Sequence, residues 1–253
     1  MSDRIVTVES LIKKYGDLTA VNGLSFEVEE GEIFGLLGPN GAGKTTTLEI
    51  METLRSKTSG KVFIDGMDID ESPEAIKKII GVQLQAAGYY PNLTLNELIR
   101  LFGGLYNRKV DSQKVLNSVG LSDRGKSKYK ELSGGQKQRF SIATTLINEP
   151  RLVFLDEPTT GLDPQARRNL WKLIRKIRDE GATVIMTTHY MEEAEELCDR
   201  VGIINEGAII SLDSPDNLID QLVASGFERN KEVKSANLED VFISLTGHEW
   251  KDE

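Results

Sequence analysis

The chain has little cysteine, histidine or aromatic content. Its 253 residues include one cysteine, two histidines and 6% aromatic residues. A single cysteine cannot form an internal disulfide, so a disulfide scaffold is excluded. Cys198 lies in the acidic stretch MEEAEELCDR without a metal-ligating partner nearby, and we expect it to be a small buried apolar residue.

Long apolar runs are also missing. IFGLLG (33–38) and RLVFL (151–155) are far shorter than the roughly 18 residues of a membrane-spanning helix. The N-terminal MSDRIVTVES lacks the apolar core of a signal peptide, so we expect a cytosolic protein. A net charge of −9 argues against a nucleic-acid surface and against unaided binding to anionic lipid. Any membrane contact must then go through another protein.

The order of the segments predicts an α/β fold in one domain with subdomains. The strand-like GEIFGLLG leads into a glycine loop and a helix that begins near Lys44. After residue 151, RLVFLDEP, the amphipathic ARRNLWKLIRKIRDE and TVIMTTH again alternate strand, helix and strand, which predicts a parallel sheet with right-handed crossovers. The stretch from Leu95 to Asn148 is patterned as helix and predicts an inserted helical lobe.

The segment GPNGAGKTT, Gly38 to Thr46, has the spacing of a phosphate-binding loop. Its glycines let backbone N–H groups converge on phosphate oxygens, and the helix that follows adds positive potential. Lys44 is suited to the β and γ phosphates, and the Thr45 hydroxyl to Mg²⁺. The alternative is a plain glycine turn between strand and helix. The strand that precedes the loop favours the phosphate-binding loop over the plain turn, and this loop in turn indicates ATP hydrolysis.

A second motif is the carboxylate pair Asp156 and Glu157 at the end of the apolar strand RLVFLDEP. Such a pair alone is more often a solvated turn. Together with a phosphate loop, it suits phosphoryl transfer, in which one carboxylate supports Mg²⁺ and its neighbour activates the attacking water. We assign Asp156 to the metal and Glu157 to the water.

The third motif, LSGGQ at Leu132 to Gln136, places a hydroxyl and two glycines at an expected helix start, which is suited to an anion. LSGGQ lies between the glycine loop and the Asp-Glu strand. In both sequence and order the chain resembles the ATP-binding cassette (ABC) ATPases, whose signature motif is LSGGQ. A P-loop kinase or GTPase would not explain this motif.

Further positions fit this resemblance. Tyr15 falls where the family has its adenine-stacking aromatic, Gln85 at the Q-loop glutamine, Asp163 at the D-loop aspartate and His189 at the switch histidine. Taken singly, Tyr15 would be a packing aromatic and His189 a structural histidine. Gln83 is the alternative to Gln85.

The resemblance implies a P-loop NTPase core with a parallel sheet, an N-terminal antiparallel β subdomain and an inserted helical subdomain. The expected boundaries are 1–84 and 151–212 for the core, 85–150 for the helical subdomain and 213–253 for a C-terminal extension, whose run LEDVFISLTG is apolar enough to dock.

The resemblance also implies a head-to-tail dimer with ATP between the subunits, in which Glu157, His189 and Lys44 are catalytic. Mg²⁺ would be held by Thr45, Gln85 and, through water, Asp156. The implied ATP-binding residues are Tyr15, Gly38, Pro39, Asn40, Gly41, Ala42, Gly43, Lys44, Thr45, Thr46 and Gln85, and, across the dimer, Ser133, Gly134, Gly135, Gln136 and Asp163.

The family most often powers transport, so we expect a separate membrane permease, with this chain on the cytoplasmic face of the membrane. A coupling helix of the permease would dock on Ala86 to Asn96, where Tyr89, Tyr90, Pro91 and Leu93 could form an apolar socket or pack on their own lobe. The tail resembles ATPases of ABC-2 exporters of drugs, lipids and polysaccharides. The alternatives are an importer ATPase and a soluble ABC ATPase acting on nucleic acid or the ribosome.

Overall fold

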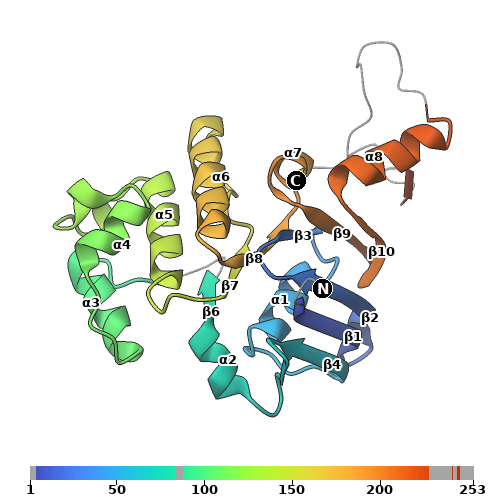
Figure 1. Cartoon of the computed structure of the whole chain (residues 1–253), viewed down its shortest axis with the longest axis horizontal. Coiled ribbons are helices and arrows are strands. Elements are labelled where there is room, and N and C mark those ends of the chain that lie inside the picture. Colours follow the sequence, from blue (N-terminus) through green and yellow to red (C-terminus); the bar gives the residue numbers. More distant parts are fainter. Residues whose placement is uncertain (1–3, 84–87, 228–240, 242–243, 246–253) are drawn as a thin grey trace.

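The computed structural model describes residues 4–83, 88–227, 241 and 244–245. These residues form two sheets with helices around them (Figure 1). The strands are β1 (Arg4–Tyr15), β2 (Leu18–Glu29), β3 (Ile33–Leu37), β4 (Ser59–Ile64), β5 (Met67–Asp68), β6 (Ile80–Gln83), β7 (Leu152–Asp156), β8 (Thr183–Thr188), β9 (Arg200–Asn205) and β10 (Ala208–Asp213). The helices are α1 (Lys44–Met51), α2 (Pro73–Ile79), α3 (Leu95–Leu105), α4 (Ser112–Ser118), α5 (Gly134–Thr145), α6 (Pro164–Asp179), α7 (Met191–Leu197) and α8 (Pro215–Ala224), with 3₁₀ turns at Ser122–Arg124 and Tyr129–Glu131.

The larger sheet is the predicted parallel sheet. Its strand order is β10-β9-β3-β8-β7-β6, and only the edge strand β10 runs antiparallel to its neighbour. Strands β3, β7 and β8 lie side by side in the middle, so the segments that follow them meet at one edge of the sheet. The phosphate loop, the Asp-Glu pair and His189 all come from that edge.

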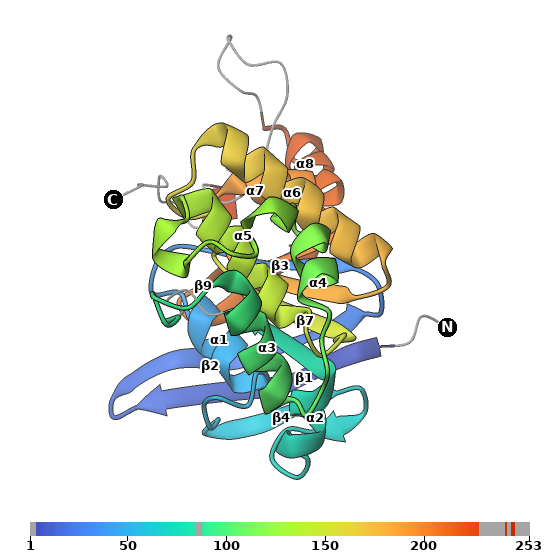
Figure 2. The same cartoon turned by 90° about the vertical axis from the view of Figure 1, so that its left-hand side faces the viewer.

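Both faces of this sheet are covered, which explains why its strands are continuously apolar. Ile33 and Leu37 of β3 face one core, and Phe34 and Leu36 face the other, as the two-residue period of a strand requires. The first core lies under α6 and α7. The second lies between the two sheets and includes Leu48 of α1. Figure 2 shows α6 and α7 above the sheet and the antiparallel sheet below it.

The smaller sheet, in the order β2-β1-β4-β5, is antiparallel. The short runs IVTVE and LSFEVE prove to be parts of two strands of 12 residues each. The sequence alone predicts one β run for KVFIDGMDI (61–69), and this prediction is wrong in one respect, because the segment folds into two strands. Asp65 and Gly66 between them have positive φ angles of 51° and 73° and turn the chain back on itself.

Helices α3, α4 and α5 form the predicted helical lobe, beside β6 in Figure 1. Thr94 caps α3 through a reciprocal bond with Glu97, which fixes where the helix begins. The three helices each contribute a fully buried side chain to the apolar core: Leu98 of α3, Leu116 of α4 and Phe140 of α5. The lobe is therefore folded around apolar contacts of its own.

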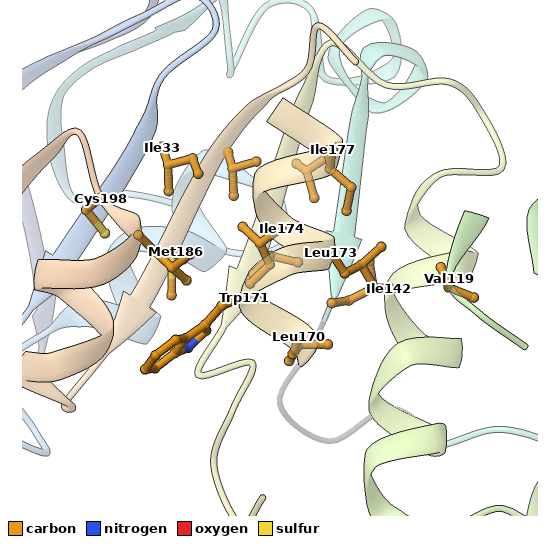
Figure 3. Packing of buried hydrophobic residues seen from close by; sticks show 14 of the residues in the cluster. Ile33, Val119, Ile142, Leu170, Trp171, Leu173, Ile174, Ile177, Met186 and Cys198 are labelled. Atoms are coloured by element: carbon orange, nitrogen blue, oxygen red, sulfur yellow. The ribbon is translucent and has the colours of Figure 1, made fainter. Parts of the chain in front are cut away.

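Helix α6 packs its apolar stripe on the parallel sheet, as its sequence period predicts (Figure 3). Trp171, Ile174 and Ile177 lie in this core, and Cys198 is buried at its far end, which confirms the expectation for the cysteine. Val241 is buried in the same core, whereas most of LEDVFISLTG lies outside the described residues. In the part of the chain that the structure describes, no helix combines the length and apolarity needed to cross a membrane.

Candidate active site

The phosphate loop connects β3 to α1, and two of its glycines are required by space. A Cβ atom on Gly38 would lie 2.3 Å from the carbonyl oxygen of Ile204. A Cβ atom on Gly43 would lie 2.4 Å from the carbonyl oxygen of Ala20, and its φ of 100° disfavours any other residue. The loop is therefore held closely between β9 and the β1–β2 hairpin.

Helix α1 begins without a cap. No side chain accepts a hydrogen bond from its first N–H groups, and its first turn has no acidic residue. In contrast, Ser133, Asp163 and Ser214 cap α5, α6 and α8 with their side chains. Free N–H groups at a helix start attract an anion, so the start of α1 fits a phosphate group.

Lys44 is the first residue of α1, and its side chain is almost fully buried. Its Nζ donates to the carbonyl oxygens of Gly38 (2.7 Å) and Pro39 (3.0 Å), across the mouth of the loop. Burial lowers the pKa of Lys44, opposed by the nearby carboxylates of Glu157 and Asp156. The ammonium group is thus desolvated and directed to the place where the loop would hold phosphate.

Asp156 ends β7 and faces Thr45. The Thr45 hydroxyl lies 3.3 and 3.2 Å from the two carboxylate oxygens, and the Thr187 hydroxyl of β8 also donates to Asp156. A hydroxyl and a carboxylate beside a phosphate site are the oxygen ligands that Mg²⁺ prefers. The pair fits the predicted metal site.

Glu157 follows directly, in a strained turn with φ of 46°. The turn is held by the Thr187 hydroxyl, which accepts from the Glu157 N–H at 3.0 Å. Oε1 of Glu157 lies 3.7 Å from Lys44 Nζ and 3.3 Å from His189 Nδ1. The three residues predicted to be catalytic are therefore together in one cluster.

The two adjacent carboxylates have pKa values shifted in opposite directions. Burial raises the pKa of Asp156, although hydrogen bonds from Thr187 and Thr45 oppose the shift. The interaction with His189 lowers the pKa of Glu157, against the effect of its burial. Opposed shifts of neighbouring acids are typical of sites where each has a separate role. Glu157 stays an ionised base, as activation of water requires.

The LSGGQ motif forms the start of α5 on the helical lobe. Ser133 Oγ accepts from Gln136 N–H at 3.3 Å, and Gln136 Oε1 accepts from Ser133 N–H at 3.0 Å. A Cβ atom on Gly134 would meet nothing within 4 Å, so this backbone is open to an approaching molecule. Among the described residues, no hydrogen bond or ion pair joins Ser133–Gln136 to the phosphate loop, which lies on the other lobe.

Residues 21–160, which carry all three motifs, match the family model described as "ABC transporter". The chain belongs to the ABC transporter family. This match confirms the resemblance seen in LSGGQ, and it identifies the chain as an ATP-binding cassette, the ATPase module of the family.

Curated relatives and solved structures of ABC cassettes agree with the family match. The probable multidrug ABC transporter ATP-binding protein YbhF of Escherichia coli K12 is 39% identical over 99% of this chain, which spans 43% of YbhF. Nod factor export ATP-binding protein I of Burkholderia orbicola is 34% identical, with both chains covered completely. The dimeric, ADP- and Pi-bound cassette MJ0796 superposes with a TM-score of 0.74 at 28% identity, over 83% of this chain and 98% of that one.

Of the two further residues predicted to bind the nucleotide in this ABC cassette, the structure describes Tyr15 and does not describe Gln85. Tyr15 lies at the end of β1, half-exposed, with Lys13 and Arg55 over its ring. The hairpin that carries it also supplies Ala20, which touches the loop at Gly43. Gln85 lies outside the described residues, whereas its alternative Gln83 is buried at the end of β6.

Asp163, expected to reach a second subunit, caps α6 of its own chain by accepting from the N–H groups of Gln165 (3.0 Å) and Ala166 (2.9 Å).

Two hydroxyl groups of the site in this ABC cassette were not among the predicted site residues. Thr187 contacts both Asp156 and Glu157, and the Thr160 hydroxyl donates to Glu157 Oε2 at 3.3 Å. The run MTTH offered a signal for Thr187, because a hydroxyl two residues before the switch histidine lies beside the end of β7 in a parallel sheet. Thr160 carried no signal beyond its closeness to Glu157.

Proposed function

We propose that this cassette hydrolyses ATP to power a separate membrane permease that exports a small molecule, drug, lipid or polysaccharide, and that it works on the cytoplasmic face of the membrane. The observation that carries the proposal is the cluster of Lys44, Glu157 and His189 beside the uncapped start of α1. It unites a phosphate site, a base and a positioning group, as phosphoryl transfer requires.

In this proposal the loop Gly38–Thr46 binds the phosphates and Lys44 contacts the β and γ groups. Glu157 orients and deprotonates the attacking water, and His189 holds Glu157 and the γ phosphate in place. Thr45 and Asp156 would hold Mg²⁺, which neutralises charge on the phosphates when bound. Gln85 would join this metal site to the helical lobe.

We further propose that the productive form is a head-to-tail homodimer with two ATP molecules between the subunits. The open backbone at Gly134 supports it, because this exposed helix start has room for an approaching molecule. The similarity to the dimeric MJ0796 cassette supports it too. Tyr15 would stack on the adenine of its own subunit's nucleotide.

The permease is proposed to dock beside the segment 88–96. Tyr89 packs inside its own lobe, with its ring centroid 5.4 Å from that of Phe140 and its hydroxyl bonded to Thr144. Tyr90 is 66% exposed and lines a shallow cavity with Pro91, Leu93 and Leu101. The predicted socket is therefore restricted to Tyr90 and its neighbours.

Export is favoured over import because relatives include a Nod factor export protein and a probable multidrug transporter protein. A role on nucleic acid or the ribosome is disfavoured by the net charge of −9. The direction can be tested with inside-out vesicles that contain the cassette and its copurified permease. Mass spectrometry of the vesicle contents should show a compound that accumulates with MgATP and does not accumulate with the Glu157→Gln variant. ATP-dependent loss of a compound would instead indicate import.

A further inference from the structure

A cavity of about 490 Å³ lies between the core and the helical lobe, next to the proposed docking segment. The core side contributes Glu52 and Leu54, which follow α1, and Lys77 of α2. The lobe side contributes Tyr106, which follows α3, and Thr144 of α5. Most of its wall is aromatic, aliphatic or hydroxylic, so a buried carboxyl group in that wall stands out.

Glu52 supplies that carboxyl group. Only 2% of the residue is exposed, and its Oε1 has no hydrogen-bond partner in the part of the chain that the structure describes. Burial, together with the negative charges of Asp156 and Glu49, raises the pKa of Glu52 to about 8. The carboxyl group is therefore costly to keep where it is.

The other buried carboxyl groups of the described residues each accept at least one hydrogen bond, although Glu193 Oε2, like Glu52 Oε1, has no partner. Glu32 accepts from Arg200 and from the Glu29 N–H, Asp156 accepts from two threonines, and Glu193 accepts from Trp171 Nε1 at 3.0 Å. Within the described residues, Glu52 differs from these three groups because no hydrogen bond or ion pair involves its carboxyl group. A buried polar group without a partner calls for an explanation, and a partner that arrives with another molecule supplies one.

The basic side chains near Glu52 are already engaged. Lys77 pairs with Glu74 at 2.6 Å, and Arg55 pairs with Glu49 at 2.5 Å. Around the cavity, Leu54 is 57% exposed and Tyr106 is 40% exposed. The site thus combines an apolar rim with an unsatisfied acid at its base, which is complementary to a basic side chain on an apolar segment.

We propose that Glu52 receives an arginine or lysine side chain from the docking segment of the permease, with apolar neighbours of that residue packed on Leu54 and Tyr106. This inference rests on the proposed permease partner. Because Glu52 directly follows α1, which begins at Lys44 and Thr45, the contact would reach the far end of the helix that starts at the phosphate loop.

The experiment uses a photo-reactive amino acid in place of Leu54 in cells, followed by mass spectrometry of the crosslinked membrane-protein peptide. We expect this peptide to contain an arginine or lysine. Glu52→Gln should lower the yield of copurified permease by at least about tenfold, the loss of a charge-assisted contact. The matched control Glu71→Gln, at an exposed glutamate, should copurify at the parent yield.

A charge exchange completes the test. Glu52→Arg should lose the permease, and replacing the crosslinked basic residue by glutamate in the permease should restore it. Glu52→Gln must melt close to the parent temperature, so that a lost contact is not mistaken for unfolding. Copurification of Glu52→Gln at the parent yield, or a crosslinked peptide without arginine or lysine, would overturn this inference alone. Failure of any membrane protein to crosslink or copurify with the parent chain would overturn the proposed permease partner as well.

Discussion

Glu157 is the residue on which the proposed chemistry depends most. Replacement by glutamine keeps the shape of the side chain and its place 3.7 Å from Lys44, but removes the base. We expect turnover to fall by about 10² to 10⁴, the contribution of a positioned general base, while ATP affinity stays near that of the parent. Steady-state phosphate release and equilibrium binding of a fluorescent ATP analogue measure the two quantities. Hydrolysis near the parent rate would mean that another group activates the water.

Glu52 should leave a signature in the pH dependence of stability. Its pKa is raised from 4.5 to about 8 in the folded state, so between these pH values the native chain binds a proton that the unfolded chain releases. The free energy of unfolding should therefore fall as pH rises, by at most about 1.4 kcal/mol per pH unit from this group.

Glu52→Gln replaces the titrating carboxyl group by an amide. The difference in the free energy of unfolding between parent and variant should therefore change steadily from pH 5 to pH 8. Urea denaturation of the two isolated chains at a series of pH values gives the measurement. Parallel curves for the two proteins would show that Glu52 titrates normally.

At the scale of elements, the cap of α5 stabilises the helix, and this role can be separated from the proposed role of Ser133 in dimerisation. Ser133→Ala removes the hydroxyl that accepts from Gln136 N–H, and should cost about 1 kcal/mol of stability. Ser214→Ala, at the cap of α8, removes an equivalent bond to Asn217 and should cost a similar amount.

Only the change at Ser133 should also weaken nucleotide-dependent dimerisation, because only that cap belongs to the signature motif. Denaturation and light scattering of both variants test the difference. Equal dimerisation by the two variants would limit Ser133 to a structural role.

The elements that the sequence predicted best are those with a strong period or a strong motif. Helix α6 shows a clear apolar stripe, and β7 and β8 are uninterrupted apolar runs because both faces of their sheet are covered. The glycine loop located a turn that few other residues would allow, because Gly41 and Gly43 have positive φ angles. LSGGQ located the start of α5.

The remaining features were hidden for physical reasons. Register shifts near Ser10 break the two-residue alternation of β1, so only its first half was recognised. Strand β6 has only four residues, too few for a period. Glu52 carries no local pattern, because the residues that surround it are distant in sequence.

At the scale of the whole molecule, the residues proposed to bind ATP lie at two separate places. The phosphate loop and the catalytic cluster lie on the core, while the exposed backbone of Gly134 lies at the edge of the helical lobe. Each chain carries a net charge of −9, so two copies repel each other at long range, and contacts made through bound MgATP would have to outweigh this repulsion. We therefore expect the chain to be a monomer without nucleotide and a dimer with MgATP. Hydrolysis should separate the two subunits again.

The Glu157→Gln variant should trap that dimer, at about twice the chain mass of 28.1 kDa in light scattering with MgATP. Adding Gly134→Leu should abolish it, because a side chain there has room in the free chain and would stand between the lobe and a second subunit. Gly104→Leu is the matched control, since Gly104 is an exposed helical glycine with equally open surroundings and lies outside the signature motif. If Gly134→Leu dimerised as well as Gly104→Leu, the second half of the ATP site would have to lie elsewhere than at the signature motif.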